Sequence, residues 1–186
     1  SRGLGDVYKR QVMCRSTSLD TRILLFAAAH RSQGLDQLFP SVTWLGSLYV
    51  LAPLALVIAA VLIQLQKRWE AMLLVIGLSG ATLLVHLLKL VLARPRPAVA
   101  ERLAALPSDS SFPSAHTMQA TAFMLCILFI VYRIWPQWGA LTALVAALLI
   151  LLVGASRIYL QVHYPSDVLA GLMLGGAWIL LVRKLL

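Results

Sequence analysis

The chain has 186 residues, of which 60% are hydrophobic and 12% are charged, and its mean hydropathy is +0.85. Soluble domains average about 45–50% apolar and about 25% charged residues, so this composition indicates a membrane protein and excludes a disordered or acidic-tail protein. The formal net charge is +9. Because the basic residues lie between long apolar runs, we attribute them to membrane topology, anionic headgroups or an anionic substrate rather than to nucleic acid.

The N-terminal region is not expected to span a membrane. Residues 1–17 are expected to be a disordered or non-native leader, and residues 18–186 a single membrane-embedded domain. The first apolar run, Ile23 to Ala29, has only seven residues and is too short to cross a bilayer. We expect Ser18 to His30 to form an interfacial helix, and the alternative is that it belongs to a sixth span. The side chains expected toward the membrane are Leu19, Ile23, Leu24 and Phe26, and those expected to point outward are Asp20, Arg22 and Arg31.

Five later segments are long and apolar enough to cross a bilayer core of about 30 Å as helices. They run from about Val42 to Leu65, Ala71 to Ala93, Ser114 to Trp135, Trp138 to Leu160 and Asp167 to Leu186. The first contains Pro53, which is expected to kink it. Short connections make consecutive helices antiparallel. The predicted fold is an all-α integral membrane protein, a bundle of five or six transmembrane helices with an N-terminal interfacial helix. The two cysteines, Cys14 and Cys126, indicate neither a disulfide framework nor a zinc site.

Three polar groups lie at the ends of these spans, and antiparallel helices place all three on one membrane face. The groups are Lys89 with Arg94-Pro95-Arg96-Pro97, Phe112-Pro113-Ser114-Ala115-His116, and Ser156-Arg157 with His163-Tyr164-Pro165-Ser166-Asp167. Ionisable residues at membrane depth are costly unless partnered. Snorkelling to headgroups would explain any single basic residue. It does not explain two histidines, several cations and one carboxylate that converge from three hairpin ends.

The opposite face carries five basic residues, Lys67, Arg68, Arg133, Arg183 and Lys184. The count of basic residues on the two faces is nearly equal, because Arg94, Arg96 and Arg102 lie on the first. Once the bases with a chemical explanation are set aside, the positive-inside rule places the five in the cytoplasm. The three polar groups then face the periplasm or exterior.

The residue types in these groups suit a phosphate. Pro113 and Pro165 are expected in the first turn of a helix, where free N–H groups and the positive end of the dipole favour an anion. Lys89, Arg96 and Arg157 add positive charge, and arginine can bind phosphate oxygens bidentately.

Two histidines are candidates for chemistry. His116 follows Ser114 and Ala115 at the expected helix start. His163 precedes Asp167 by four residues, so a carboxylate on one ring nitrogen would leave the other nitrogen as a nucleophile. His86 lies one helical turn before Lys89, and a buried, hydrogen-bonded role is a better explanation for it than a place in the site.

Together, the three groups resemble the type 2 phosphatidic acid phosphatase superfamily, which also includes the vanadium haloperoxidases and glucose-6-phosphatase. The family pattern is a Lys, six residues and Arg-Pro; a Pro-Ser-Gly-His; and a Ser-Arg, five residues, His, three residues and Asp. Lys89 to Pro97 and Ser156 to Asp167 match this spacing. Pro113 to His116 matches except that Ala115 replaces the glycine.

The resemblance implies a two-step phosphate hydrolysis that needs neither a metal nor a cofactor. His163 would attack phosphorus to give a phosphohistidine, and Asp167 would orient it. His116 would protonate the leaving oxygen and then activate water. The equatorial oxygens would be held by Lys89, Arg96, Ser114, Arg157 and the N–H groups of Ala115 and His116.

The expected function is that of an inner-membrane phosphatase acting on lipid phosphate monoesters or diphosphates. Undecaprenyl diphosphate, phosphatidylglycerol phosphate and phosphatidic acid are the candidate substrates, and no nucleic acid partner is expected. A lipid phosphotransferase would use the same residues, and a non-catalytic anion-binding membrane protein is the alternative from another class. A haloperoxidase is disfavoured because the relatives of that kind are soluble.

Overall fold

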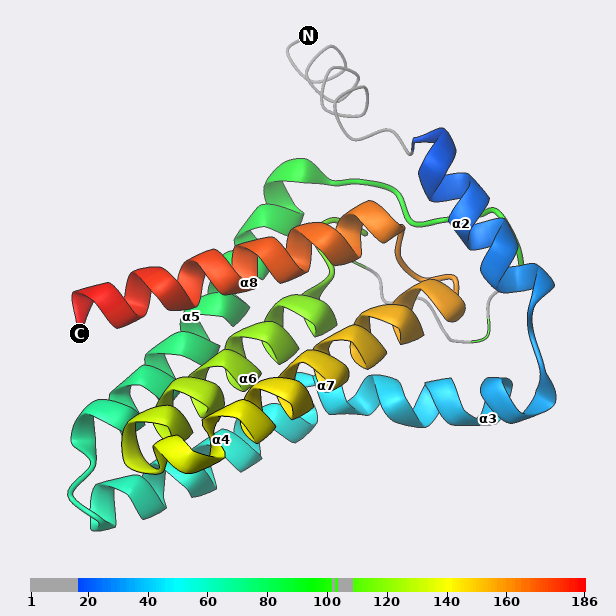
Figure 1. Cartoon of the computed structure of the whole chain (residues 1–186). Coiled ribbons are helices and arrows are strands. Elements are labelled where there is room, and N and C mark those ends of the chain that lie inside the picture. The colour runs from blue at the N-terminus through cyan, green and yellow to red at the C-terminus, as the bar shows by residue number, and fades with distance from the viewer. Residues whose placement is uncertain (1–16, 102, 104–108) are drawn as a thin grey trace, which may run out of the picture.

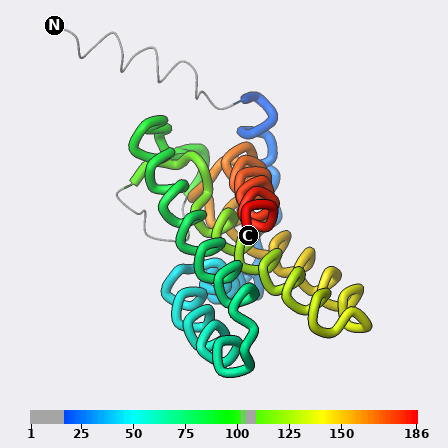
Figure 2. Tube along the Cα trace, turned by 90° about the vertical axis from the view of Figure 1, so that its left-hand side faces the viewer, coloured from blue at the N-terminus to red at the C-terminus, as the bar shows by residue number. Residues whose placement is uncertain are grey.

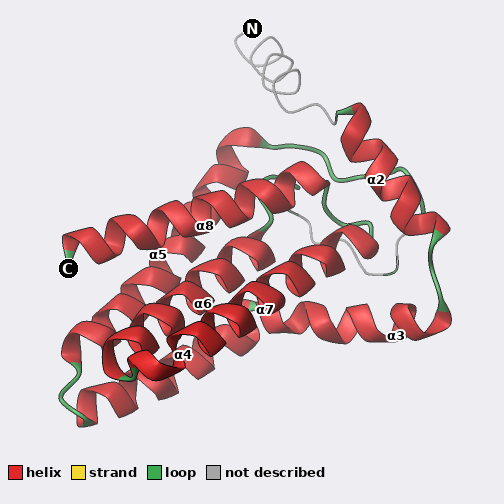
Figure 3. Ribbon diagram, viewed as in Figure 1, coloured by secondary structure: helices red, strands yellow, loops and turns green. Residues whose placement is uncertain are grey.

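A computed structural model of the chain describes residues 17–101, 103 and 109–186. Every regular element in these ranges is a helix (Figure 3). The elements are α2 (Ser18–Ala29), α3 (Gln33–Val42), the 3-10 turn η1 (Thr43–Gly46), α4 (Leu48–Gln64), α5 (Arg68–Leu92), α6 (Ala115–Ile134), the 3-10 turn η2 (Pro136–Trp138), α7 (Gly139–Tyr159) and α8 (Pro165–Leu185). Residues 1–16 of the expected leader, with Cys14, lie outside the described residues.

The predicted all-α membrane fold is confirmed. Within the described ranges, α5, α6, α7 with η2, and α8 are each long and apolar enough to cross a membrane, and α3 to α4 qualifies as a fifth span if the bent pair crosses as one. The ends of α5 to α8 lie within three residues of the segments expected from hydropathy. Figure 2 looks nearly along α8, with the α4–α5 hairpin on one side and the α6–α7 hairpin on the other.

The break in the first span was expected at Pro53, but α4 continues through this proline. The break lies instead at Ser47, between η1 and α4, where the two parts of the span meet at 44°. Ser47 has an extended backbone, and its hydroxyl accepts a hydrogen bond from the amide of Tyr49 at 3.3 Å. A serine that caps a helix in this way favours a new helix start more strongly than the hydropathy pattern reveals.

Helix α2 forms where a helix was expected, but two of its side chains point the other way. Thr17 and Asp20 make a capping box at its start. Asp20, expected to point outward, is only 2% exposed, and Leu24, expected toward the membrane, is fully buried. The reason is that α2 lies across the ends of α7 and α8 (Figure 1). The side chain of Gln161 donates to the carbonyl oxygen of Leu24 at 2.9 Å. The position of α2 at a membrane interface stays a prediction.

Helices α6 and α8 pack closely through glycines of α8. A Cβ atom at Gly171 would lie 2.8 Å from the carbonyl oxygen of Ser114, and one at Gly175 would lie 2.8 Å from that of Met118. Small residues of this kind let the backbones of membrane helices approach. The first turns of α6 and α8, which carry the predicted site, are therefore held against each other.

We expect Gly175→Ala to destabilise the protein by about 1–3 kcal/mol, because a methyl group there meets α6 backbone that cannot move aside. Gly176→Ala is the matched control, since a Cβ at that neighbouring position would meet nothing closer than 4.0 Å. The melting temperatures of both variants in detergent are the measurement. Equal melting temperatures for the two variants would contradict the tight α6–α8 contact.

Candidate active site

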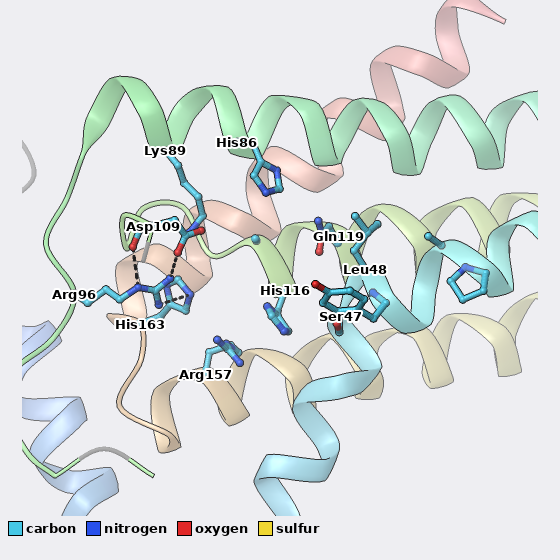
Figure 4. A pocket seen from close by; sticks show the side chains of 14 residues that line it. Ser47, Leu48, His86, Lys89, Arg96, Asp109, His116, Gln119, Arg157 and His163 are labelled. Atoms are coloured by element: carbon cyan, nitrogen blue, oxygen red, sulfur yellow. Dashed lines mark hydrogen bonds and ion pairs between the residues drawn. The ribbon is translucent and has the colours of Figure 1, made fainter. Parts of the chain in front are cut away.

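The three polar groups meet around a cavity of about 580 Å³ at one end of the bundle. Figure 4 shows side chains from α5, α6, α7 and the segment before α8 pointing toward this common space. Of the residues predicted for the site, those that line the cavity are Lys89, Arg96, Ala115, His116, Arg157 and His163. Ser114 and Asp167, also predicted, are fully buried behind its wall.

The start of α6 differs in one respect from the sequence prediction. Ser114 caps the helix, so Pro113 precedes the cap and does not lie in the first turn; Pro165 is the first residue of α8, as expected. The Ser114 hydroxyl accepts from the amide of Thr117 at 3.4 Å and shares a 2.9 Å hydrogen bond with the Thr117 hydroxyl. This hydroxyl is therefore engaged within the helix, and the amides of Ala115 and His116 are the backbone groups nearest the cavity side of the cap.

His163 is 1% exposed and lies between a carboxylate and a guanidinium. Its Nδ1 atom is 3.5 Å from Oδ2 of Asp167, and its Nε2 atom is 3.4 Å from Nη1 of Arg96. Burial, together with the charges of Arg157 and Arg96, lowers the pKa of His163 to about 4, although Asp167 opposes the shift. The imidazole is therefore neutral near pH 7, and its Nε2 atom lies toward Arg96, which also lines the cavity.

The cavity also holds a carboxylate that the sequence did not reveal. Asp109 forms ion pairs with Nζ of Lys89 at 2.8 Å and with Nη2 of Arg96 at 2.5 Å. Burial raises the pKa of Asp109, but hydrogen bonds from Lys89 and Arg96 outweigh that effect and the pKa is lowered. A single aspartate in a polar loop gives no signal in the sequence that it will meet two cations so far along the chain.

The opposite wall of the cavity is formed by His116 and Arg157. Nη1 of Arg157 donates to the hydroxyl of Thr43 at 2.5 Å, so η1 orients this guanidinium. His86 is hydrogen-bonded, as expected, through Nδ1 to the carbonyl oxygen of Thr82 at 2.7 Å. It is not buried, however, and it lines the cavity. The expected burial of His86 is therefore wrong, because its side chain faces the cavity and not the packed interior of the bundle.

Arg94 has a specific structural place that the sequence did not indicate. Its guanidinium contacts the carboxylate of Asp167, donates to the hydroxyl of Ser166 at 2.8 Å and pairs with Asp20 at 3.1 Å. The sequence predicted no binding or catalytic role for Arg94. The available signal was the doubled Arg-Pro-Arg-Pro, in which the second arginine reaches the cavity and the first reaches behind it. Arg102, the other such residue, lies outside the described ranges.

An apolar groove between α4 and α5 adjoins the polar cavity. This groove has a volume of about 490 Å³. It shares Leu48, Ala52 and His86 with the cavity, and its other lining residues are almost all aliphatic. A hollow lined by cations and a groove lined by hydrocarbon therefore lie next to each other.

Comparisons with known proteins agree on one family. The PAP2 superfamily profile matches residues 70–186. The chain is 31% identical over 169 residues to phosphatidylglycerophosphatase B of Bacillus subtilis (strain 168), covering 89% of this chain and 82% of that protein. It is 33% identical over 153 residues to undecaprenyl-diphosphatase BcrC of the same organism, covering 78% and 72%.

Solved structures share the fold over nearly the whole chain. The crystal structure of a transmembrane PAP2-type phosphatidylglycerolphosphate phosphatase from Bacillus subtilis has a TM-score of 0.85 and 29% identity, covering 98% of this chain and 92% of that chain. Aquifex aeolicus LpxE has a TM-score of 0.74 and 26% identity, covering 91% and 97%. A profile match over more than half of the residues, with two relatives above 30% identity, shows that this chain belongs to the PAP2 superfamily, as an integral membrane hydrolase of phosphoric ester or anhydride bonds.

Proposed function

We propose that the chain hydrolyses the phosphate monoester or diphosphate of a membrane lipid through a phosphohistidine on His163. The observation that carries this proposal is that the cationic cavity and the apolar groove adjoin each other and share lining residues. A lipid phosphate could place its headgroup beside Lys89, Arg96 and Arg157 while its chain lies between α4 and α5. The names of the relatives, which refer to phosphatidylglycerophosphate and undecaprenyl diphosphate, support a substrate of this class.

The first step is attack on phosphorus by Nε2 of His163. The Nδ1–H group points toward Asp167, whose negative charge stabilises the imidazole as it becomes positive. Their separation of 3.5 Å is long for a hydrogen bond, and such contacts tighten when the substrate is bound. The equatorial oxygens gain charge in this step, and the three cations that line the cavity stabilise them.

Departure of the lipid oxygen requires a proton. Attack and departure are in line, so the leaving oxygen lies on the side of phosphorus away from His163. His116 lines the cavity at the start of α6, beside the cations that would hold the phosphate, and is the proposed proton donor for this step. In the second step the same imidazole, now neutral, removes a proton from the water that cleaves the phosphohistidine, and phosphate is released.

Asp109 must release Lys89 and Arg96 when the substrate phosphate binds. A phosphate that binds Lys89 and Arg96 competes with this carboxylate for the same donors, and its side chain is 39% exposed and free to move into water. Among the described residues, no three His, Cys, Asp or Glu side chains lie close enough together to hold a metal ion. This donor set supports catalysis that rests on the cations of the chain itself.

The function is tested by phosphate release from the purified chain in detergent with EDTA present. The panel comprises phosphatidylglycerol phosphate, undecaprenyl diphosphate, phosphatidic acid and the soluble glycerol 3-phosphate. We expect at least one lipid to be hydrolysed much faster than glycerol 3-phosphate, and His163→Ala to retain no more than a few per cent of that rate. Loss of activity in EDTA, transfer of phosphate to a lipid rather than water, or full activity of His163→Ala would each contradict a named part of the proposal.

His116→Ala should slow the hydrolysis of a lipid phosphate by about 10²–10⁴-fold, the usual contribution of a general acid. The loss should be much smaller for 4-nitrophenyl phosphate, because a good leaving group needs no proton. The ratio of kcat/KM for the two substrates is the measurement. If both fall by the same factor, His116 does not act as the proton donor.

We propose that the cavity faces the outside of the cell. A cysteine at Glu101, in the loop beside the cavity, should react with a membrane-impermeant thiol reagent in intact cells. A cysteine at Lys67, between α4 and α5, should react only after the cells are opened. Both positions are exposed, and both variants are made in a background without Cys14 and Cys126. The reverse labelling pattern would place the cavity in the cytoplasm.

A further inference from the structure

Asp20 of α2 is buried against the start of α8. Its Oδ1 atom accepts a hydrogen bond from the amide of Ser166 at 2.9 Å, and its Oδ2 atom accepts one from the Ser166 hydroxyl at 2.8 Å. A carboxylate in this position satisfies a free N–H group in the first turn of α8 and complements the dipole of that helix. Burial raises the pKa of Asp20, but these hydrogen bonds outweigh that effect and the pKa is lowered, so the side chain is ionised at neutral pH.

Arg94 connects Asp20 to the carboxylate beside the nucleophile. Nη2 of Arg94 lies 3.1 Å from Oδ2 of Asp20, and Nη1 contacts Oδ1 of Asp167. The guanidinium also lies over the ring of Tyr164, 4.3 Å from its centroid. Both carboxylates and the guanidinium are at most 4% exposed. At such burial an unpaired charge is costly, so the three groups depend on one another.

The remaining oxygen of Asp167 is equally constrained. Its Oδ2 atom accepts from the hydroxyl of Ser111 at 2.5 Å and from the amide of Tyr164 at 2.9 Å, and it faces Nδ1 of His163 at 3.5 Å. The charges alternate along the row from Asp20 to Arg94, Asp167 and His163. When His163 becomes positive during attack, the row becomes neutral. Without Asp20, Arg94 would direct its whole charge at Asp167 and reduce the attraction of that carboxylate for His163.

We propose that Asp20 is a positioning residue of the phosphatase: through Arg94 and the start of α8 it holds Asp167 against His163. The inference rests on the proposed function of His163. Asp20 lies outside residues 70–186, which match the family profile, and Arg94 lies two residues before the arginine that lines the cavity. Helix α2 is then part of the catalytic apparatus although none of its residues lines the cavity.

The main test compares Asp20→Asn with Asp36→Asn in the full chain. Asp36 anchors α3 to α7 by accepting a 2.6 Å hydrogen bond from the hydroxyl of Tyr159, so its variant loses an anchor of the same kind that is not part of the row from Asp20 to His163. For Asp20→Asn we expect kcat to fall on the order of 10-fold or more, as for a displaced reacting group, with KM unchanged. The loss should be the same for a lipid phosphate and for 4-nitrophenyl phosphate, because the nucleophile serves both. Asp36→Asn should keep the wild-type kcat.

A double-mutant cycle separates positioning from general packing. If Asp20 acts through Arg94, the variant with both Asp20→Asn and Arg94→Gln should be no slower than Arg94→Gln alone, whereas independent packing effects multiply. If Arg94→Gln does not fold, the comparison of Asp20→Asn with Asp36→Asn decides on its own. Equal kcat for those two variants, or a loss confined to KM, would overturn the positioning role while wild-type phosphate release leaves the proposed function standing. Absence of release by the wild type would instead remove the proposed function.

Discussion

The candidate site depends on one junction between two helix starts. The amide of Ser114, which caps α6, donates to the carbonyl oxygen of Asp167 in the first turn of α8 at 3.1 Å. Gly171 lets the backbones approach just beyond this hydrogen bond. His116 extends from one helix and His163 immediately precedes the other, so their separation follows from backbone packing and not from flexible side chains. A site that places two imidazoles on opposite sides of one phosphorus atom needs rigidity of this kind.

The electrostatics around that junction are divided into two layers. On the cavity side, Lys89 and Arg96 both pair with the partly exposed Asp109. Behind the cavity, Arg94 is neutralised by the buried carboxylates of Asp20 and Asp167. An entering phosphate can therefore replace the front carboxylate without disturbing the rear row. The rear charges are buried, which keeps the carboxylate beside His163 in one orientation.

The sequence predicted the features that have strong local signals. Spans α5 to α8 follow from hydropathy, and the convergence of the cavity residues follows from antiparallel spans and matched spacing. Prediction from the sequence failed where a tertiary contact overrides a local pattern. Asp20 looked like an outward charge on an amphipathic helix until Arg94 and Ser166 appeared beside it. The first span breaks at Ser47 and not at Pro53, because Ser47 caps the start of α4 and the helix accommodates the proline. Asp109 is beyond such reasoning, since only the folded loop brings it to Lys89.

The bend at Ser47 divides the first span into two parts that make different contacts. The part before it is fixed to α7, because Asp36 accepts a hydrogen bond from Tyr159 and Thr43 accepts one from Arg157. The part after it, α4, forms one wall of the apolar groove and contributes nothing to the row of charges behind His163. Substitutions at Ala55 and Leu56, which line the groove but not the cavity, can therefore reshape the groove for a longer, bulkier or branched hydrocarbon while the cavity residues stay unchanged. Such an arrangement lets a lineage diversify its choice of lipid without passing through inactive intermediates.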